Sequence, residues 1–346
     1  MSRLPPIDLP ERTCQPAVGP LGIILILACL ASVFGCENPT PSGSDTASPS
    51  AAAGTPAASP AEPTPAATGA TQAGDVDGLV VLTGGALSMG TPAGAFVRLD
   101  GPGGEVTGFS SASGRVIART AEPAFAIADV DPTGSSPAVW RVVEAPAPEI
   151  RHSLAAPALS HRGNLAAFAV ADPGTNESFQ IVVIDLANGD RRMTPLDRRA
   201  NGPPVWIDDA SVLVEVLPIP GGTPFLRLDP ATGAVKPVAA DGYGPAISGD
   251  GSVLALASTD GSVLAVPTAG WLAGTLPDEG AVVDASGSPF QLAVDASGRR
   301  LAIGYADAAG DPASIAIFVR EGEGWRRSAA RVQVAAGTVT MLGWLN

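Results

Sequence analysis

The sequence contains little lysine and little cysteine. Lys236 is the only lysine among 20 basic residues, which face 34 acidic ones, so the formal net charge is −14. Nucleic acids and anionic membrane surfaces attract clusters of Lys and Arg, and this balance therefore argues against a nucleic-acid partner. The three cysteines all lie within the first 36 residues, so the rest of the chain can form neither a disulfide nor a thiolate metal site.

Catalytic motifs are also missing from the sequence. Of the two histidines, His152 is predicted to end a strand of the repeats described below and His161 to lie in a turn on the opposite face, so we do not expect them to share a metal site. There is no Gly-x-Ser-x-Gly elbow, no His-Glu-x-x-His motif and no phosphate-binding loop. We therefore expect no catalytic residue, no metal site and no cofactor.

Residues 1–36 have the features of an export signal. An uncharged apolar run of 15 residues, Leu21–Gly35, is short for a membrane-spanning helix and typical of a signal sequence. It ends in Val33-Phe34-Gly35-Cys36, which resembles the lipobox of bacterial lipoproteins. The resemblance implies that Cys36 is acylated and that the protein is anchored by lipid to the extracytoplasmic face of the cell membrane. The alternatives are an uncleaved signal anchor, a second lipobox at Cys29, or a wrongly assigned start site.

Residues 37–74 are predicted to be a disordered tether. They contain no Val, Ile, Leu, Phe, Tyr or Trp and consist mostly of Ala, Pro, Ser, Thr and Gly. Such a segment buries too little apolar surface to offset the entropy lost on folding.

From about residue 75 the chain contains short apolar runs separated by Gly, Pro and Asp, which is typical of many short strands. One repeated unit is an apolar strand that ends in Asp, with Gly four residues later, where a turn bonded by the Asp side chain reverses the chain. Clear copies occupy residues 94–105, 179–190 and 223–234, and degenerate copies raise the number to six.

A second repeated unit is a short strand, a tight turn and a longer apolar strand. We assign copies of it to residues 115–129, 157–172, 203–217, 244–258 and 290–307. Combining the two units predicts sheets of four strands, A to D, with strand A innermost. One sheet is split: its strand A comes from 338–344, and its strands B, C and D from 79–83, 94–100 and 105–110. Pairing of the two ends would close a ring without open edges.

These repeats resemble the Tol-B-like propeller repeats of bacterial envelope proteins, P-x-x-S-x-D-G-x-x-L-A followed by I-x-x-x-D-x-x-x-G. The resemblance implies an all-β fold in which residues 75–346 form a single β-propeller of six four-stranded blades. A ring of seven blades or a two-sheet sandwich is the alternative. The resemblance does not assign a function, because propellers carry many unrelated activities.

Strand A is expected to line an axial channel. Its polar side chains are predicted to be Arg119, Thr120, Ser160, Ser248, Gln291, Thr338 and Thr340. None of the predicted strands A contains Glu, Asp, Asn or His, which metal-dependent propeller enzymes need in the channel. Trp206 and Trp344 occupy matching positions in strand A and are predicted to be core residues.

The candidate binding face is formed by the B–C and D–A connections, which we expect to point away from the membrane. Its predicted residues are Asp131, Asp172, Glu177, Arg198, Arg199, Asp241, Tyr243, Asp260, Asp307 and Asp311. The alternative is that these are ordinary solvated loops. We expect a non-enzymatic binding or scaffold module for an envelope protein or a surface glycan. The other hypotheses are a propeller-type hydrolase, lactonase or lyase that uses this face, and a passive structural protein of the envelope.

Overall fold

The computed structural model describes most of the chain from Gly74 onward. The described residues are 74–120, 124–143, 153, 155–171, 178–220, 224–238, 241–274, 281–284, 289–305, 314–332 and 339–345. The predicted lipobox, with Cys36, and the predicted tether except for its last residue, Gly74, lie outside them. No helix among the described residues has the length and apolarity needed to cross a membrane.

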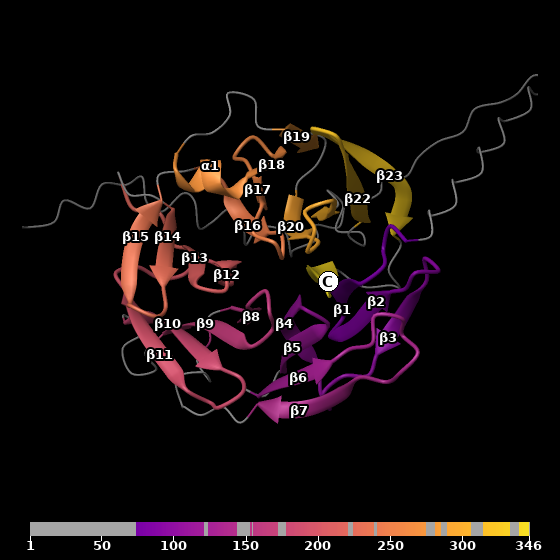
Figure 1. Ribbon diagram of the computed structural model, residues 1–346, viewed down its shortest axis with the longest axis horizontal. Helices are drawn as coiled ribbons and strands as arrows, with labels where there is room; N and C mark the ends of the chain where they lie inside the picture. The colour runs from indigo at the N-terminus through magenta and orange to yellow at the C-terminus, as the bar shows by residue number, and fades with distance from the viewer. Residues whose placement is uncertain are drawn as a thin grey trace, which may run out of the picture. The chain divides into compact units, whose positions relative to one another are not determined.

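The described strands form six antiparallel sheets of four strands, arranged around an axis as the blades of a propeller (Figure 1). From the inside outward, blade 1 is β24 (Val339–Trp344), β1 (Leu79–Thr83), β2 (Ala86–Gly90) and β3 (Phe96–Leu99). Blade 2 is β4 (Val106–Ala112), β5 (Arg115–Thr120), β6 (Phe125–Asp129) and β7 (Val139–Val143). Blade 3 is β8 (Ala158–Leu159), β9 (Leu165–Ala171), β10 (Phe179–Asp185) and β11 (Arg191–Leu196).

The remaining three blades follow the same order. Blade 4 is β12 (Val205–Asp208), β13 (Ser211–Glu215), β14 (Phe225–Asp229) and β15 (Ala234–Val238). Blade 5 is β16 (Tyr243–Ile247), β17 (Val253–Ala257), β18 (Val263–Pro267) and β19 (Ala281–Asp284), with the short helix α1 (Thr268–Leu272) after β18. Blade 6 is β20 (Pro289–Val294), β21 (Arg300–Tyr305), β22 (Ser314–Glu321) and β23 (Gly324–Val332).

The prediction of an all-β, six-bladed propeller with a split blade is therefore confirmed, but two blades were assigned one strand out of step. The strand missed in blade 1 is β2, which follows β1 after only Gly84-Gly85. The segment 94–100, predicted as strand C, is strand D of blade 1, and 105–110, predicted as strand D, belongs to the innermost strand of blade 2. As a result 115–120 is strand B of blade 2, not strand A, and 125–129 is strand C.

The core consists of the contacts between blades. The buried apolar side chains of the described residues form six clusters, and each cluster combines two neighbouring blades. Because every blade buries both faces, its middle strands are apolar on both sides: β13 and β17, for example, are buried along their whole length. Phe225 of blade 4 and Trp271 beside blade 5 meet edge to face at 5.1 Å.

The predicted turns are seen where their strands were assigned correctly. In blade 3 the carboxylate of Asp185 accepts a hydrogen bond from the Ala187 backbone N–H at 2.8 Å, and its carbonyl accepts one from Gly189 N–H at 2.8 Å. Blade 4 repeats this arrangement at Asp229 and Gly233. Both glycines have a positive φ, a conformation that residues with a Cβ rarely adopt.

The ring closes in blade 1, where β24 pairs antiparallel with β1, so that Leu79 lies opposite Trp344. Trp344 is 3% exposed, and its Nε1 donates to Ala293 O of blade 6 at 3.0 Å. Trp206 is 2% exposed and makes the equivalent bond from blade 4 to Ala158 O of blade 3, also at 3.0 Å. The prediction that both tryptophans are core residues is confirmed, and each also joins two innermost strands.

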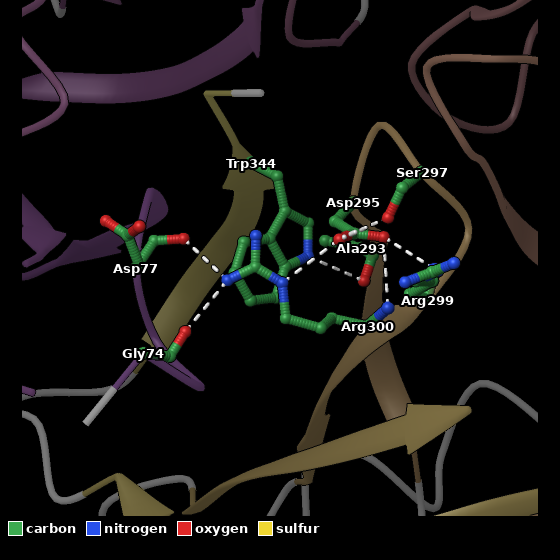
Figure 2. A network of polar contacts seen from close by, with 8 residues as sticks. All are labelled: Gly74, Asp77, Ala293, Asp295, Ser297, Arg299, Arg300 and Trp344. Atoms are coloured by element: carbon green, nitrogen blue, oxygen red, sulfur yellow. Dashed lines mark hydrogen bonds and ion pairs between the residues drawn. The ribbon is translucent and has the colours of Figure 1, made fainter. Parts of the chain in front are cut away.

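Arg300 of blade 6 fastens the first described residues to this seam (Figure 2). Its Nη1 donates to the carbonyls of Gly74 at 3.0 Å and Asp77 at 2.9 Å, while its Nε lies 3.0 Å from Asp295 Oδ2. The guanidinium carbon also lies 4.4 Å from the centre of the Trp344 ring. The chain therefore enters and leaves the propeller on the same face, that of the A–B and C–D turns.

Candidate functional site: the axial cavity

The innermost strands enclose a cavity of about 630 Å³. Each of the six blades contributes an apolar side chain to its wall. These residues are Phe109, Leu159, Trp206, Ile247, Leu292 and Met341. A volume of this size and a largely apolar wall are usual for sites that bind small molecules.

Glu215 is the buried carboxylate of this wall. It is the last residue of β13 and only 8% exposed. Asn201 Nδ2 donates to Glu215 Oε1 at 2.6 Å, and the Gly244 backbone N–H donates to Glu215 Oε2 at 2.9 Å. Asn201 lies in the connection that leads into blade 4, and Gly244 lies at the start of β16, so Glu215 is near the face of the B–C and D–A connections.

Two prolines just before β12 explain why Glu215, a residue of the second strand of blade 4, reaches the cavity. Residues 199–201 pair with 215–217, since Asn201 N bonds Glu215 O and Leu217 N bonds Arg199 O. β12 begins only at Val205, after Gly202-Pro203-Pro204. Proline cannot donate to a ladder, so the innermost strand bulges out here and leaves Glu215 at the cavity.

A second bulge supplies the other hydrogen bond to Glu215. In β16 the pairing shifts between Tyr243 and Ala246, across Gly244-Pro245. Gly244 has a φ of +59°, which favours glycine, and its N–H points to Glu215 instead of a neighbouring strand. Two proline-containing irregularities in adjacent blades therefore position one carboxylate.

His161 and Asp250 line the opposite end of the cavity, in the A–B turns of blades 3 and 5. His161 Nε2 lies 3.1 Å from Trp206 O. Asp250 Oδ1 accepts hydrogen bonds from Ser248 Oγ at 2.6 Å, Ser252 N at 2.9 Å and Ser252 Oγ at 2.7 Å. Burial disfavours its charged form, but these bonds outweigh burial and lower the pKa of Asp250.

Most of the described residues of the predicted binding face lie where they were expected. Arg198, Arg199 and Asp241 belong to D–A connections, Tyr243 is the first residue of β16 just after such a connection, and Asp260 belongs to the B–C connection of blade 5. Tyr243 also lines the cavity. The other predicted residues Asp172, Glu177, Asp307 and Asp311 lie outside the described residues, as does His152.

The placement of Asp131 on this face is wrong. Because β6 is strand C and not strand B, the β6–β7 connection lies with the A–B turns on the opposite face. Hydrogen bonds from the hydroxyl of Ser135 and from the hydroxyl and backbone N–H of Thr133 lower the pKa of Asp131 to about 2. The carboxylate of Asp131 therefore stabilises the β6–β7 loop that contains it.

The predicted lining of the channel needs a similar correction. Arg119 and Thr120 belong to the second strand of blade 2, and the innermost strand β4 brings Ser110 and Ser111 to the cavity instead. Thr338 lies outside the described residues. The prediction considered only innermost strands, and for that reason it missed Glu215. The available signal was a single acid within the apolar run Ser211–Leu217, close to Pro203-Pro204.

The described residues contain no group of three or more His, Cys, Asp or Glu that could hold a metal ion. What the cavity offers is a buried carboxylate at one end, a histidine and a second carboxylate at the other, and an apolar wall between them. Within the described lining there is no Arg or Lys. The arrangement is suited to binding a ligand through shape and negative charge.

By sequence, the chain matches no protein-family model and no curated protein. Its structure is similar to that of TolB from Acinetobacter baumannii, with a TM-score of 0.55 and 16% identity, over 79% of this chain and 67% of that one. It is also similar to an oligogalacturonate lyase solved in complex with manganese, with a TM-score of 0.50 and 12% identity, over 72% of each chain. Identities this low show the fold alone, a TolB-like propeller.

Proposed function

We propose that the chain is a non-enzymatic binding module of the cell envelope, held at the extracytoplasmic side of the membrane through Cys36. The observation that carries the proposal is the axial cavity, which has the volume of a small-molecule site and a lining that combines apolar and polar side chains. The apolar run and lipobox-like residues before Cys36 support the location.

The face of the B–C and D–A connections is the proposed docking surface for a partner with basic groups. It carries the carboxylates of Asp241 and Asp260 together with Arg198 and Arg199, of which Arg198 pairs with Asp197, and Glu215 lies toward the same side. Carboxylates on loops attract cationic partners mainly by accelerating encounter, an effect that salt screens.

In-cell crosslinking followed by mass spectrometry tests this proposal. The Asp241→Asn/Asp260→Asn double variant should reduce recovery of the partner severalfold and flatten its dependence on salt. Asp131→Asn removes one carboxylate on the opposite face and should leave recovery unchanged. Equal recovery with all three proteins would contradict a docking role for this face. Turnover of a glycan oligomer that is lost in Glu215→Gln would instead identify an enzyme of the lyase or hydrolase kind.

A further inference from the structure

We propose that the axial cavity binds a small organic primary amine, with the ammonium group on Glu215 and an apolar body along the wall. This inference rests on the proposed function, because it assigns a ligand class to the cavity of the binding module. Four features of the described residues lead to it: the sign of the charge, the unused capacity of Glu215, the fixed apolar wall, and the volume.

The charge of the cavity favours cations. Its described lining contains the carboxylates of Glu215 and Asp250 and neither Arg nor Lys. A concave site with low-dielectric walls concentrates the field of such charges, so a cation is attracted and an anion is repelled. His161, at the far end, is the one histidine of the described lining.

Glu215 differs from the other carboxylate in how its oxygens are used. Asp250 is held by three donors of its own turn. Glu215 has two donors, Asn201 Nδ2 and Gly244 N, and both are neutral. No Arg, Lys or His of the described residues forms an ion pair with it.

An ionised carboxylate can accept about four hydrogen bonds, so roughly two acceptor positions of Glu215 are unfilled by protein groups. Burial of a carboxylate without a counter-charge is costly. An ammonium group supplies the missing positive charge and three N–H donors at once. A neutral alcohol would supply a donor without the charge.

The wall fits the rest of such a molecule. The indole N–H groups of Trp206 and Trp344 are both bonded to backbone carbonyls, which fixes the two rings at the cavity. Phe109, Leu292 and Met341 extend the apolar surface from other blades. The volume of about 630 Å³ lies well within the range of small-molecule sites, so the occupant we propose is a small molecule.

The test compares three probes of one shape on the purified full chain: 4-phenylbutylamine, 4-phenylbutanol and 4-phenylbutyrate. Isothermal titration calorimetry at neutral pH should show the amine binding at least tenfold tighter than the alcohol, and no binding of the carboxylate. Glu215→Gln keeps the size and an acceptor oxygen but removes the charge, and it should reduce amine affinity to that of the alcohol. Glu105→Gln, the same change at an exposed acid outside the cavity lining, should retain the preference.

The amine site would be overturned if the amine and the alcohol bound with equal affinity, or if the preference for the amine persisted in Glu215→Gln. Neither result would affect the docking proposal, because crosslinking tests that proposal separately. Failure of all three probes to bind would overturn the amine site too. If Glu215→Gln does not fold, nuclear Overhauser contacts on the unmodified chain decide. Contacts from the methylene next to the amine to the amides of Asn201 and Gly244 support the site, and their absence refutes it.

Discussion

Asp295 and Glu215 are the buried carboxylates of the described chain, and their surroundings differ. Asp295 accepts bonds from the backbone N–H groups of Arg299 and Arg300 and pairs with the Arg300 guanidinium. Glu215 receives only two amide N–H groups. Removing one partner of a buried ion pair leaves the other charge buried without compensation, which destabilises the fold strongly. A buried carboxylate without a counter-charge, such as Glu215, already lowers the stability of the protein.

Arg300→Met should therefore destabilise the propeller strongly. The change leaves the Asp295 carboxylate, whose side chain is 5% exposed, without its partner and frees the carbonyls of Gly74 and Asp77. We expect a loss of about 3 kcal/mol in the free energy of unfolding, measured by urea denaturation.

Arg326→Met is the matched control for that measurement. Arg326 pairs with Glu321 at 2.7 Å, but both side chains are more than half exposed, so the loss should stay below about 1 kcal/mol. Similar losses for the two variants would show that the seam contacts of Arg300 contribute no more than a surface ion pair.

At the scale of the strand, the strands of blades 3 to 6 lay where the pattern indicated, and each of these blades has Asp in at least one of its reversals. Such a turn was not sufficient by itself, because the copy at residues 94–105 also has its Asp and Gly and was still assigned to strand C instead of strand D. The strand assignment of blade 1 was wrong because β2 is joined to β1 by only two glycines, so the sequence 79–90 looks like one strand instead of two. The assignment of blade 2 was wrong as a result, because β4 had been counted as the last strand of blade 1 and the next strands were each placed one position too early.

Residues 125–129 (FAIAD) and 168–172 (FAVAD) have similar sequences, and this similarity led to the assignment of 115–129 as a copy of the second repeated unit. Residues 125–129 form β6, which is strand C of blade 2, whereas residues 168–171 belong to β9, which is strand B of blade 3. Strands B and C are both buried on two faces, so the same apolar sequence suits either position. The site could not be found for a related reason. Glu215 reaches the cavity through bulges at Pro203-Pro204 and Gly244-Pro245, and a bulge depends on pairing partners that are distant in sequence.

Deletion of residues 339–346 removes β24 and should open the ring in blade 1. Without β24, the inner edge of β1 is left unpaired, and blade 6 loses Trp344. An exposed apolar edge is a template for pairing with another chain. We expect the deleted protein to form larger species than the full chain in size-exclusion chromatography with light scattering.

Deletion of Asn346 alone leaves β24 intact and should give the elution of the full chain. An unchanged size after the longer deletion would mean that β24 is dispensable for closing the ring.

The whole molecule combines an acidic propeller with the predicted lipid attachment. If Cys36 is acylated, Cys36→Ser should move the protein from the membrane fraction to the soluble fraction and abolish labelling with a clickable fatty acid, because the lipid chains supply the membrane affinity. Fractionation and in-gel fluorescence measure both.

Cys29→Ser changes the cysteine that lies within the apolar run and should leave both readouts unaltered. Membrane retention and labelling that persist in Cys36→Ser would refute the lipobox, and loss of both in Cys29→Ser would place the acylated cysteine there instead.

We expect the split of blade 1 to delay closure of the ring during folding. β1 is made before every other strand of the propeller, and its inner partner β24 is made after all of them. Blades 2 to 6 can each form from neighbouring segments, but blade 1 has only three strands until synthesis reaches Val339. Contacts between distant segments form slowly because a long loop must close first. Ring closure should therefore be the last and slowest step, and the chain is most exposed to misassembly just before it.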